Sequence, residues 1–137
     1  MSKTAADLTP DALEFLSARH LGSLTTVRQA GTPHVVAVGF TYDEDAEVVR
    51  VITFEGSQKV LNVERAGYAA VFQVDGPRWL TLEGPASVHR DPDAVAEGER
   101  RYANRYKQPK VNPRRVVVQI EVKRVLGSRT LLGGTVS

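Results

Sequence analysis

The chain has 137 residues, a formal net charge of +2, 42% hydrophobic residues and 25% charged residues, which suits one globular domain with a single core. Cysteine is absent, which excludes disulfides, thiolate metal sites and cysteine nucleophiles and suits a reducing compartment, so we expect a cytosolic protein. The small net charge gives no reason to expect a nucleic-acid partner, and the longest apolar run, Val35–Phe40, is much shorter than the roughly 20 residues of a membrane helix.

The predicted elements follow from the spacing of apolar residues and from helix caps and turn residues. In chain order they are a helix opened by Thr9-Pro10-Asp11, strands over Leu21–Val27, His34–Phe40 and Glu47–Thr53, a helix over Ser57–Arg65 that ends at Gly67, strands over Tyr68–Val74 and Arg78–Val88, a helix from Asp91 to Tyr106, and a strand over Val116–Val125.

These elements indicate a mostly β fold of the α+β kind. The links between neighbouring strands are short and carry turn residues, as in Ala30-Gly31-Thr32-Pro33, so consecutive strands are expected to pair antiparallel. We therefore expect a six-stranded meander that closes toward a barrel, with three short helices. The segment Gln108–Arg114 contains two prolines and is expected to be an extended connection. One domain is expected over residues 8–130, between flexible tails at residues 1–7 and 131–137.

Common catalytic motifs are missing from the sequence. The three histidines, His20, His34 and His89, lie far apart without ligand spacing, so no metal site is expected. No G-x-S-x-G, P-loop or G-x-G-x-x-G pattern is present, which excludes most hydrolases and Rossmann dehydrogenases. If the protein is an enzyme, a cofactor therefore carries the chemistry.

The most informative local pattern is Gly56-Ser57-Gln58-Lys59, which follows a β-rich run and begins a helix. Backbone amides at a helix start, a serine hydroxyl and a lysine charge together can hold a phosphate. The alternative interpretation is a capped helix with a solvated lysine. A second basic cluster contains Lys107, Lys110, Arg114 and Arg115, and it indicates either a local anion site or solvated loop charge.

The run His34–Phe40 is rich in small and β-branched residues, which leave strand backbone accessible to a flat ring. An ordinary buried strand has the same composition. Trp79, the single tryptophan, follows Arg78 and is expected either to wall a ring-binding cleft or to lie half-buried at an interface.

Several ordered blocks carry a resemblance that extends from about Leu8 to Leu132. The blocks are HVVAVGFTYD, VITFEGSQK, QVDGPRWLTLEG, RYANRYK and NPRRVVVQIEVKRVLG. With these blocks the chain resembles the superfamily of flavin and deazaflavin oxidoreductases, which includes the pyridoxamine 5'-phosphate oxidases, and within it is most similar to actinobacterial deazaflavin-dependent biliverdin reductases. The resemblance implies a split β-barrel of the FMN-binding type that dimerises and holds its cofactor in a groove between subunits.

The resemblance also implies a set of cofactor-binding residues. In chain order they are Val35, Val36, Ala37 and Val38 under the ring, Thr53 as a polar neighbour, Ser57, Gln58 and Lys59 at the phosphate, Asn62 and Gln73 as further polar neighbours, and Arg78 and Trp79 from the partner subunit or on the open side of the cleft.

Arg78, Lys107 and Arg115 are candidates for attracting the carboxylates of a substrate, and Arg78, Trp79 and Arg115 for orienting it. The chain departs from the pyridoxamine 5'-phosphate oxidases because it ends soon after its last predicted strand and lacks their C-terminal arginine and histidine motif. Pyridoxine chemistry is therefore not expected.

The implied function is reduction of a conjugated substrate by reduced coenzyme F-420, with biliverdin converted to bilirubin by a cytosolic homodimer. Hydride would reach the central methine bridge, and a pyrrole nitrogen would take a proton. Two alternatives use the same groove: an FMN-dependent oxidase or reductase, and a carrier that binds a flavin, a deazaflavin or a bilin without turnover.

Overall fold

The computed structural model describes residues 2–133. Eight strands, three α-helices and two short 3-10 helices form within this range. In chain order they are η1 (Ala5–Asp7), α1 (Pro10–Ser17), β1 (Gly22–Val27), β2 (Pro33–Val38), β3 (Thr41–Asp43), β4 (Val48–Phe54), α2 (Gln58–Ala66), β5 (Tyr68–Asp75), β6 (Arg78–His89), α3 (Pro92–Arg105), β7 (Arg115–Glu121), β8 (Arg124–Gly127) and η2 (Arg129–Leu131).

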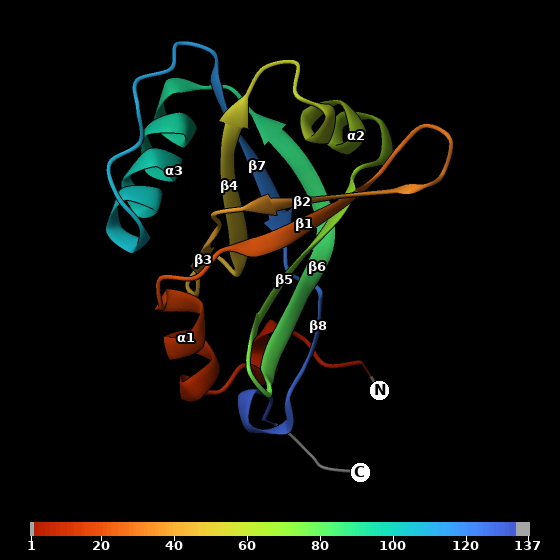
Figure 1. Ribbon diagram of the computed structural model, residues 1–137, viewed down its shortest axis with the longest axis vertical. Helices are drawn as coiled ribbons and strands as arrows, with labels where there is room; N and C mark the ends of the chain where they lie inside the picture. The colour runs from red at the N-terminus through yellow and green to blue at the C-terminus, as the bar shows by residue number, and fades with distance from the viewer. Residues whose placement is uncertain (1, 134–137) are drawn as a thin grey trace.

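The strands form an antiparallel arrangement in the order β2-β1-β5-β6-β7-β4-β3, with β8 paired to β6. The long strand β6 joins two sheets, because it pairs with β5 up to Pro85, with β8 from Leu80 to Glu83, and with β7 from Ala86 to His89. Figure 1 shows α2 and α3 beside the upper parts of the long strands, while α1 lies at their lower end. The predicted mostly β fold closing toward a barrel is confirmed.

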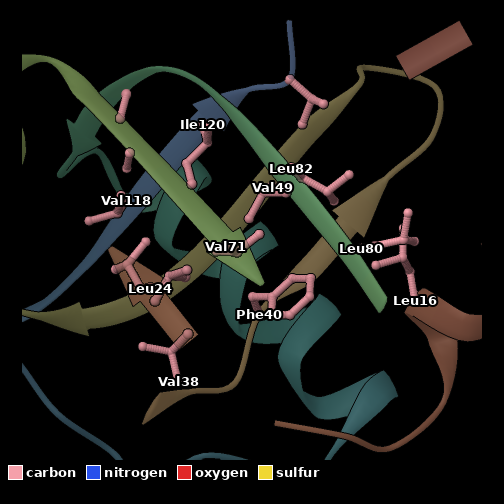
Figure 2. Packing of buried hydrophobic residues seen from close by; sticks show 14 of the residues in the cluster. Leu16, Leu24, Val38, Phe40, Val49, Val71, Leu80, Leu82, Val118 and Ile120 are labelled. Carbon is pink, nitrogen blue, oxygen red and sulfur yellow. The ribbon is translucent and has the colours of Figure 1, made fainter. Parts of the chain in front are cut away.

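The core lies between the inner faces of the two sheets. Cross-strand register places Leu24, Val71 and Leu82 on one face, and all three side chains are buried. Val49 and Ile120 pair in the other sheet and are fully buried as well. Figure 2 shows side chains of both sheets meeting between the strands. Alternation of buried and exposed residues therefore leaves one outer face on each sheet for other contacts.

Two of the predicted helix starts have the expected caps. The Thr9 hydroxyl accepts a hydrogen bond from the backbone N–H of Ala12, and the Asp91 carboxylate accepts one from Ala94. The end of α2 is also as predicted, because Gly67 adopts φ 69° there, in the left-handed region that glycine favours. These boundaries depend on local backbone chemistry, which explains why the sequence predicts them within a residue or two.

The predicted count of six strands is wrong. Thr41–Asp43 pairs with β4 as the additional strand β3. The predicted strand Val116–Val125 divides into β7 and β8, because the backbone N–H of Val122 donates to Glu47 while that of Lys123 donates to Glu83. The chain thus changes partners within two residues, which no local pattern could reveal.

Gly84 lies where β6 passes from one sheet to the other. The strand continues through it, since Gly84 pairs with Ala69, and a Cβ atom built on Gly84 would lie 1.8 Å from the carbonyl oxygen of Glu121. Only glycine admits the backbone that crosses between β7 and β8 at this point.

Parts of the two predicted tails have regular structure. Lys3 forms an isolated bridge with Val125, and residues 5–7 form η1. Leu131 is fully buried in η2, whereas residue 1 and residues 134–137 lie outside the described range. Across residues 2–133, no helix combines the length and the apolar character needed to cross a bilayer.

Candidate cofactor-binding groove

A groove of about 740 Å³ lies between the end of β2, α3 and the extended segment after α3. Its walls come from segments far apart in the sequence. The lining residues are Ala37, Val38, Gly39, Ile52, Lys59, Tyr102, Lys107, Gln108, Pro109, Lys110, Val111, Asn112 and Arg115. Residues 107–112 belong to no helix or strand, as the two prolines in this segment predict. This volume is large enough for a drug-sized or cofactor-sized ligand.

Four cations line this groove, and they differ in how they are bonded. Arg115 is already engaged, because its Nε lies 3.1 Å from a Glu99 carboxylate oxygen and its Nη2 donates to the Lys110 carbonyl oxygen at 2.5 Å. Within residues 2–133, the structure gives no ion pair to Lys59, Lys107 or Lys110. The groove therefore presents three ammonium groups to an anionic ligand, while Arg115 supports the wall that carries one of them.

Of the three lysines, Lys59 is the least exposed to solvent. Its Nζ lies 5.8 Å from the centroid of the Phe54 ring, and burial lowers the pKa of Lys59 below its ordinary value. An anion placed beside Lys59 would favour the charged form and raise that pKa again. This environment strengthens attraction between Lys59 and a bound phosphate, since less water screens it.

The phosphate hypothesis concerns the start of α2. Gly56 adopts φ 83°, which turns the chain from β4 into the helix, and Ser57 occupies the N-cap position. Unlike Thr9 and Asp91, Ser57 makes no side-chain cap bond, and its hydroxyl lies 3.3 Å from the Thr53 hydroxyl. The first amides of α2 thus receive no cap from Ser57, and the positive end of the helix dipole lies next to Lys59.

The predicted ring platform is the edge strand β2. Val35 and Ala37 are exposed, whereas Val36 and Val38 point to the other face and Val38 is buried. Strand β2 lies at one end of the sheet order, so one side of its backbone has no neighbouring strand within the described structure. The backbone groups on that side are accessible to a ring laid against the strand.

Two predicted polar neighbours are engaged inside the protein. Asn62 is 1% exposed; its amide donates to Thr26 at 3.0 Å and accepts from Gln58 at 2.8 Å. Gln73 is also 1% exposed, donates to the Phe15 carbonyl oxygen and accepts from Arg105. The structure brings neither side chain to the groove lining. Asn62 connects α2 to β1, and Gln73 on β5 connects α1 and α3.

Arg78 and Trp79 lie at the start of β6, and neither lines the groove of their own chain. Arg78 pairs with Asp75 at 3.3 Å, and its guanidinium lies 5.0 Å from the centroid of the Phe15 ring. Trp79 lines a different cavity of about 550 Å³, together with Arg124 and Leu126. Within one chain, the structure therefore does not bring these two residues to Lys59.

The outer face of the sheet that contains β2, β1, β5, β6 and β8 carries an apolar patch. Cross-strand register places Ala37 next to Ser23, Ser23 next to Phe72, Val74 next to Trp79, and Thr81 next to Leu126. The large apolar side chains on this face are at least one-third exposed: Val35, Phe72, Val74, Trp79 and Leu126. Because Ala37 belongs both to this face and to the groove lining, the patch continues into the groove.

Residues 8–129 match the family profile described as pyridoxamine 5'-phosphate oxidase. The chain belongs to the pyridoxamine 5'-phosphate oxidase family. A family relative in Mycobacterium tuberculosis (strain CDC 1551 / Oshkosh), a biliverdin reductase dependent on reduced coenzyme F-420, is 56% identical over 132 residues, which cover 96% of each chain.

Two solved structures of the same fold are similar to this family member. A conserved hypothetical protein of Mycobacterium tuberculosis has a TM-score of 0.77 and 23% identity, covering 99% of this chain and 98% of its own. A structure named as an F-420 reductase has a TM-score of 0.68 and 26% identity, covering 82% of this chain and 94% of its own. The resemblance stated from the sequence blocks is confirmed.

The sequence does not predict several of the residues that line the groove. Gly39, Ile52 and Tyr102 line the groove, yet each was part of an expected strand or helix with no special feature. The basic cluster at residues 107–115 was the one signal available, and the structure divides it. Lys107, Lys110 and Arg115 face the groove, whereas Arg114 donates to the Glu55 carbonyl oxygen at 2.8 Å.

Proposed function

We propose that this family member is an oxidoreductase that uses reduced coenzyme F-420 to convert biliverdin to bilirubin in the cytosol. The observation that carries the proposal is the 56% identity to a biliverdin reductase with that cofactor, over 96% of both chains. The cationic groove supports it independently, because a phosphorylated cofactor with a flat ring needs both anion-binding groups and an accessible strand edge.

The groove residues suit the chemical features of such a cofactor. Lys59, Ser57 and Gln58 at the start of α2 would hold the phosphate, and Lys107 and Lys110 would meet further negative charge. The outward side of β2 would support the ring through backbone hydrogen bonds. Lys59, Lys107 and Lys110 line the groove and have no ion pair within residues 2–133, so these three cations fit a phosphorylated cofactor. Ser57 and Gln58 lie beside that lining, where their side chains are hydrogen-bonded to Thr53 and Asn62.

The bound cofactor supplies the hydride when it is reduced. In biliverdin, the central methine carbon would gain that hydride, and a pyrrole nitrogen would gain a proton from solvent. The chain's own residues have the tasks of orienting the tetrapyrrole and excluding water. Tyr102 and Val111 are suited to this, since both line the groove and carry apolar surface.

The proposal includes a symmetric homodimer formed through the outer sheet face. An exposed apolar patch that spans several strands is typical of an interface, and twofold symmetry pairs such a patch with itself. Because the patch runs from Trp79 to the groove residue Ala37, a partner can bring its own Trp79 and Arg78 to the open side of the groove. This arrangement would complete a substrate site that one chain leaves open.

Cofactor binding is tested by titrating the purified apoprotein with oxidised coenzyme F-420 and, separately, with FMN. We expect Lys59→Ala to weaken coenzyme F-420 binding by about 1.5–3 kcal/mol, the size of a hydrogen bond to a charged group, with little change in Tm. Lys123→Ala, which removes an exposed lysine outside the groove, should bind like the parent. Equal affinity of Lys59→Ala and parent would place the phosphate elsewhere, and preferential FMN binding would favour the FMN-dependent alternative.

Turnover is tested anaerobically by following the loss of biliverdin absorbance with reduced coenzyme F-420 or with NADPH as donor. We expect reduction with the deazaflavin alone, because the chain has no G-x-G-x-x-G turn to hold a dinucleotide. Biliverdin should react faster than its dimethyl ester, with a difference that shrinks as salt rises. Rapid reduction of a quinone instead of biliverdin would overturn the substrate assignment, and the absence of any turnover would support the carrier.

The dimer is tested by light scattering at micromolar concentration, which should give about twice the chain mass of 15.0 kDa. Trp79→Asp places a charge in the apolar patch and should shift the protein toward the monomer while lowering turnover. A parent protein that is monomeric and fully active would contradict the shared site.

A further inference from the structure

The Arg90 guanidinium holds the turn that leads from β4 into α2. Arg90, in the link between β6 and α3, donates from Nε to Glu55 Oε2 at 2.7 Å and from Nη2 to Glu55 Oε1 at 2.5 Å. The remaining Nη1 lies 2.9 Å from Glu64 Oε2 on α2. All three guanidinium nitrogens thus bind carboxylates, one before the helix and one within it.

The backbone of the same turn is held from another side. The N–H of Glu55 donates to the Arg114 carbonyl oxygen at 2.9 Å, and the Arg114 side chain donates back to the Glu55 carbonyl oxygen at 2.8 Å. Glu55 therefore has its backbone bonded to the segment before β7 and its side chain bonded to Arg90. The residue after Glu55 is Gly56, with a positive φ, so the position of Glu55 determines where Ser57 and the start of α2 lie.

We propose that Arg90 is a positioning residue for the anion-binding start of α2, acting through Glu55 and without contacting the cofactor itself. The inference rests on the proposed function, because it assumes that the phosphate binds at Ser57, Gln58 and Lys59. The two-pronged Arg90–Glu55 pair fixes direction as well as distance, which a single hydrogen bond does not. A helix start aimed at a ligand needs such support, since a small displacement of its amides loses their alignment.

The solvent exposure of the Arg90–Glu55 pair indicates that it positions the turn more than it stabilises the fold. The side chains of Arg90 and Glu55 are 43% and 42% exposed, and exposed ion pairs stabilise folded proteins only slightly. The hydrogen bonds from Arg90 nonetheless hold the pKa of Glu55 below its ordinary value, so the carboxylate stays ionised and paired at neutral pH. Removing the pair should therefore leave the fold intact and loosen the turn.

Two neutralising substitutions separate positioning from a long-range charge effect. Arg90→Gln removes a positive charge and Glu55→Gln removes a negative one, so a pure field effect on an anion would have opposite signs in the two variants. Positioning predicts the same sign in both: coenzyme F-420 affinity falls about fivefold in each, and the double variant is no worse than either single one. At saturating cofactor, kcat should stay close to the parent value.

Two further variants serve as controls. Glu64→Gln leaves both Arg90–Glu55 hydrogen bonds possible and should bind the cofactor nearly as the parent does. Arg100→Gln removes an arginine of similar exposure that pairs with Glu97 on α3, outside the turn, and should have no effect on affinity. Melting temperatures of all four single variants should lie close together.

The outcomes decide between the explanations. Tighter or unchanged binding by Glu55→Gln, or unchanged binding by Arg90→Gln, would overturn the positioning role. A fall in kcat at saturating cofactor instead of a fall in affinity would overturn it as well. If Lys59→Ala binds like the parent while Arg90→Gln and Glu55→Gln bind weakly, the turn positions a ligand through other atoms, and the proposed phosphate site falls while the role of Arg90 stands.

Discussion

Replacing Arg105 by Ala tests whether its side chain anchors the end of α3. The segment that follows this end forms one wall of the groove. The guanidinium donates to Gln73 Oε1 and to the Phe40 carbonyl oxygen, each at 2.5 Å, and to the Ala18 carbonyl oxygen at 2.9 Å. It also lies 4.7 Å from the centroid of the Phe40 ring. One side chain therefore connects α3 to β5, to the link before β3 and to the end of α1.

The expected decrease in the free energy of unfolding follows from the contacts that each partner of Arg105 loses. Gln73 is 1% exposed, and its side-chain oxygen would be left without the hydrogen bond from Arg105, which costs about 1–3 kcal/mol. Loss of the contact with the Phe40 ring adds about 0.5–2 kcal/mol. The Ala18 oxygen can turn to water and adds little. The Tyr106 hydroxyl lies 3.2 Å from the Phe40 oxygen, but its single proton is shared with the His20 oxygen at 2.6 Å, so it replaces only part of the bond that the Phe40 oxygen loses. We expect a total of about 2–4 kcal/mol, because such terms overlap.

The assay is urea unfolding of Arg105→Ala, Arg105→Lys and Arg100→Ala beside the parent. A loss of about 2–4 kcal/mol corresponds to a fall in Tm of roughly 6–15 °C for a domain of this size. The free energy of unfolding of Arg105→Lys should lie between those of the parent and Arg105→Ala. Lysine keeps the positive charge but lacks the planar guanidinium that donates several hydrogen bonds at once. Arg100→Ala removes an exposed arginine on the same helix and should cost less than about 1 kcal/mol. A cost below about 1 kcal/mol for Arg105→Ala would refute the reasoning.

Two further predictions concern the same helix and the groove. Glu97 accepts hydrogen bonds from Arg100 and Arg101, which lower the pKa of Glu97 from 4.5 to about 2, so its ion pairs stabilise the fold above about pH 4.5 and lose that effect as the pH falls toward 2. The stability difference between parent and Glu97→Gln should therefore be present at pH 7, at no more than about 1 kcal/mol, and vanish near pH 2; a difference that grows on acidification would contradict this. Gly39→Ala should destabilise by about 1–3 kcal/mol and weaken coenzyme F-420 binding, because its Cβ would lie 2.9 Å from the Tyr102 ring; unchanged affinity in a binding titration would show that Tyr102 does not shape the site.

Local chemistry explains why much of the fold could be predicted. The capping residues Thr9 and Asp91 and the terminating Gly67 act within a few residues of themselves, so their effect is visible in the sequence. Alternation of apolar residues likewise predicts which strand faces are buried. The cationic segment at residues 107–115 was visible for the same reason, since charge composition does not depend on the fold.

The candidate site shows the limit of such reasoning. Asn62 and Gln73 are polar residues near the expected cofactor, yet they bond to Thr26 and Arg105, which are 36 and 32 residues away in the chain. A polar side chain on a helix or strand has no local feature that distinguishes a ligand contact from such a structural bond. The division of Arg114 and Arg115 between the turn and the groove has the same origin.

The sequence by itself therefore determined the helices, most strands, the family and the presence of anion-binding residues, because each depends on neighbours in the chain or on ordered blocks of residues. Only the tertiary structure decided that β6 joins two sheets, that β8 separates from β7, and that Lys59 shares a groove with Lys107 and Lys110. These features arise where segments distant in the chain exchange hydrogen bonds or exclude one another's atoms, as the Glu121 backbone does against Gly84. No pattern within a single segment contains that information.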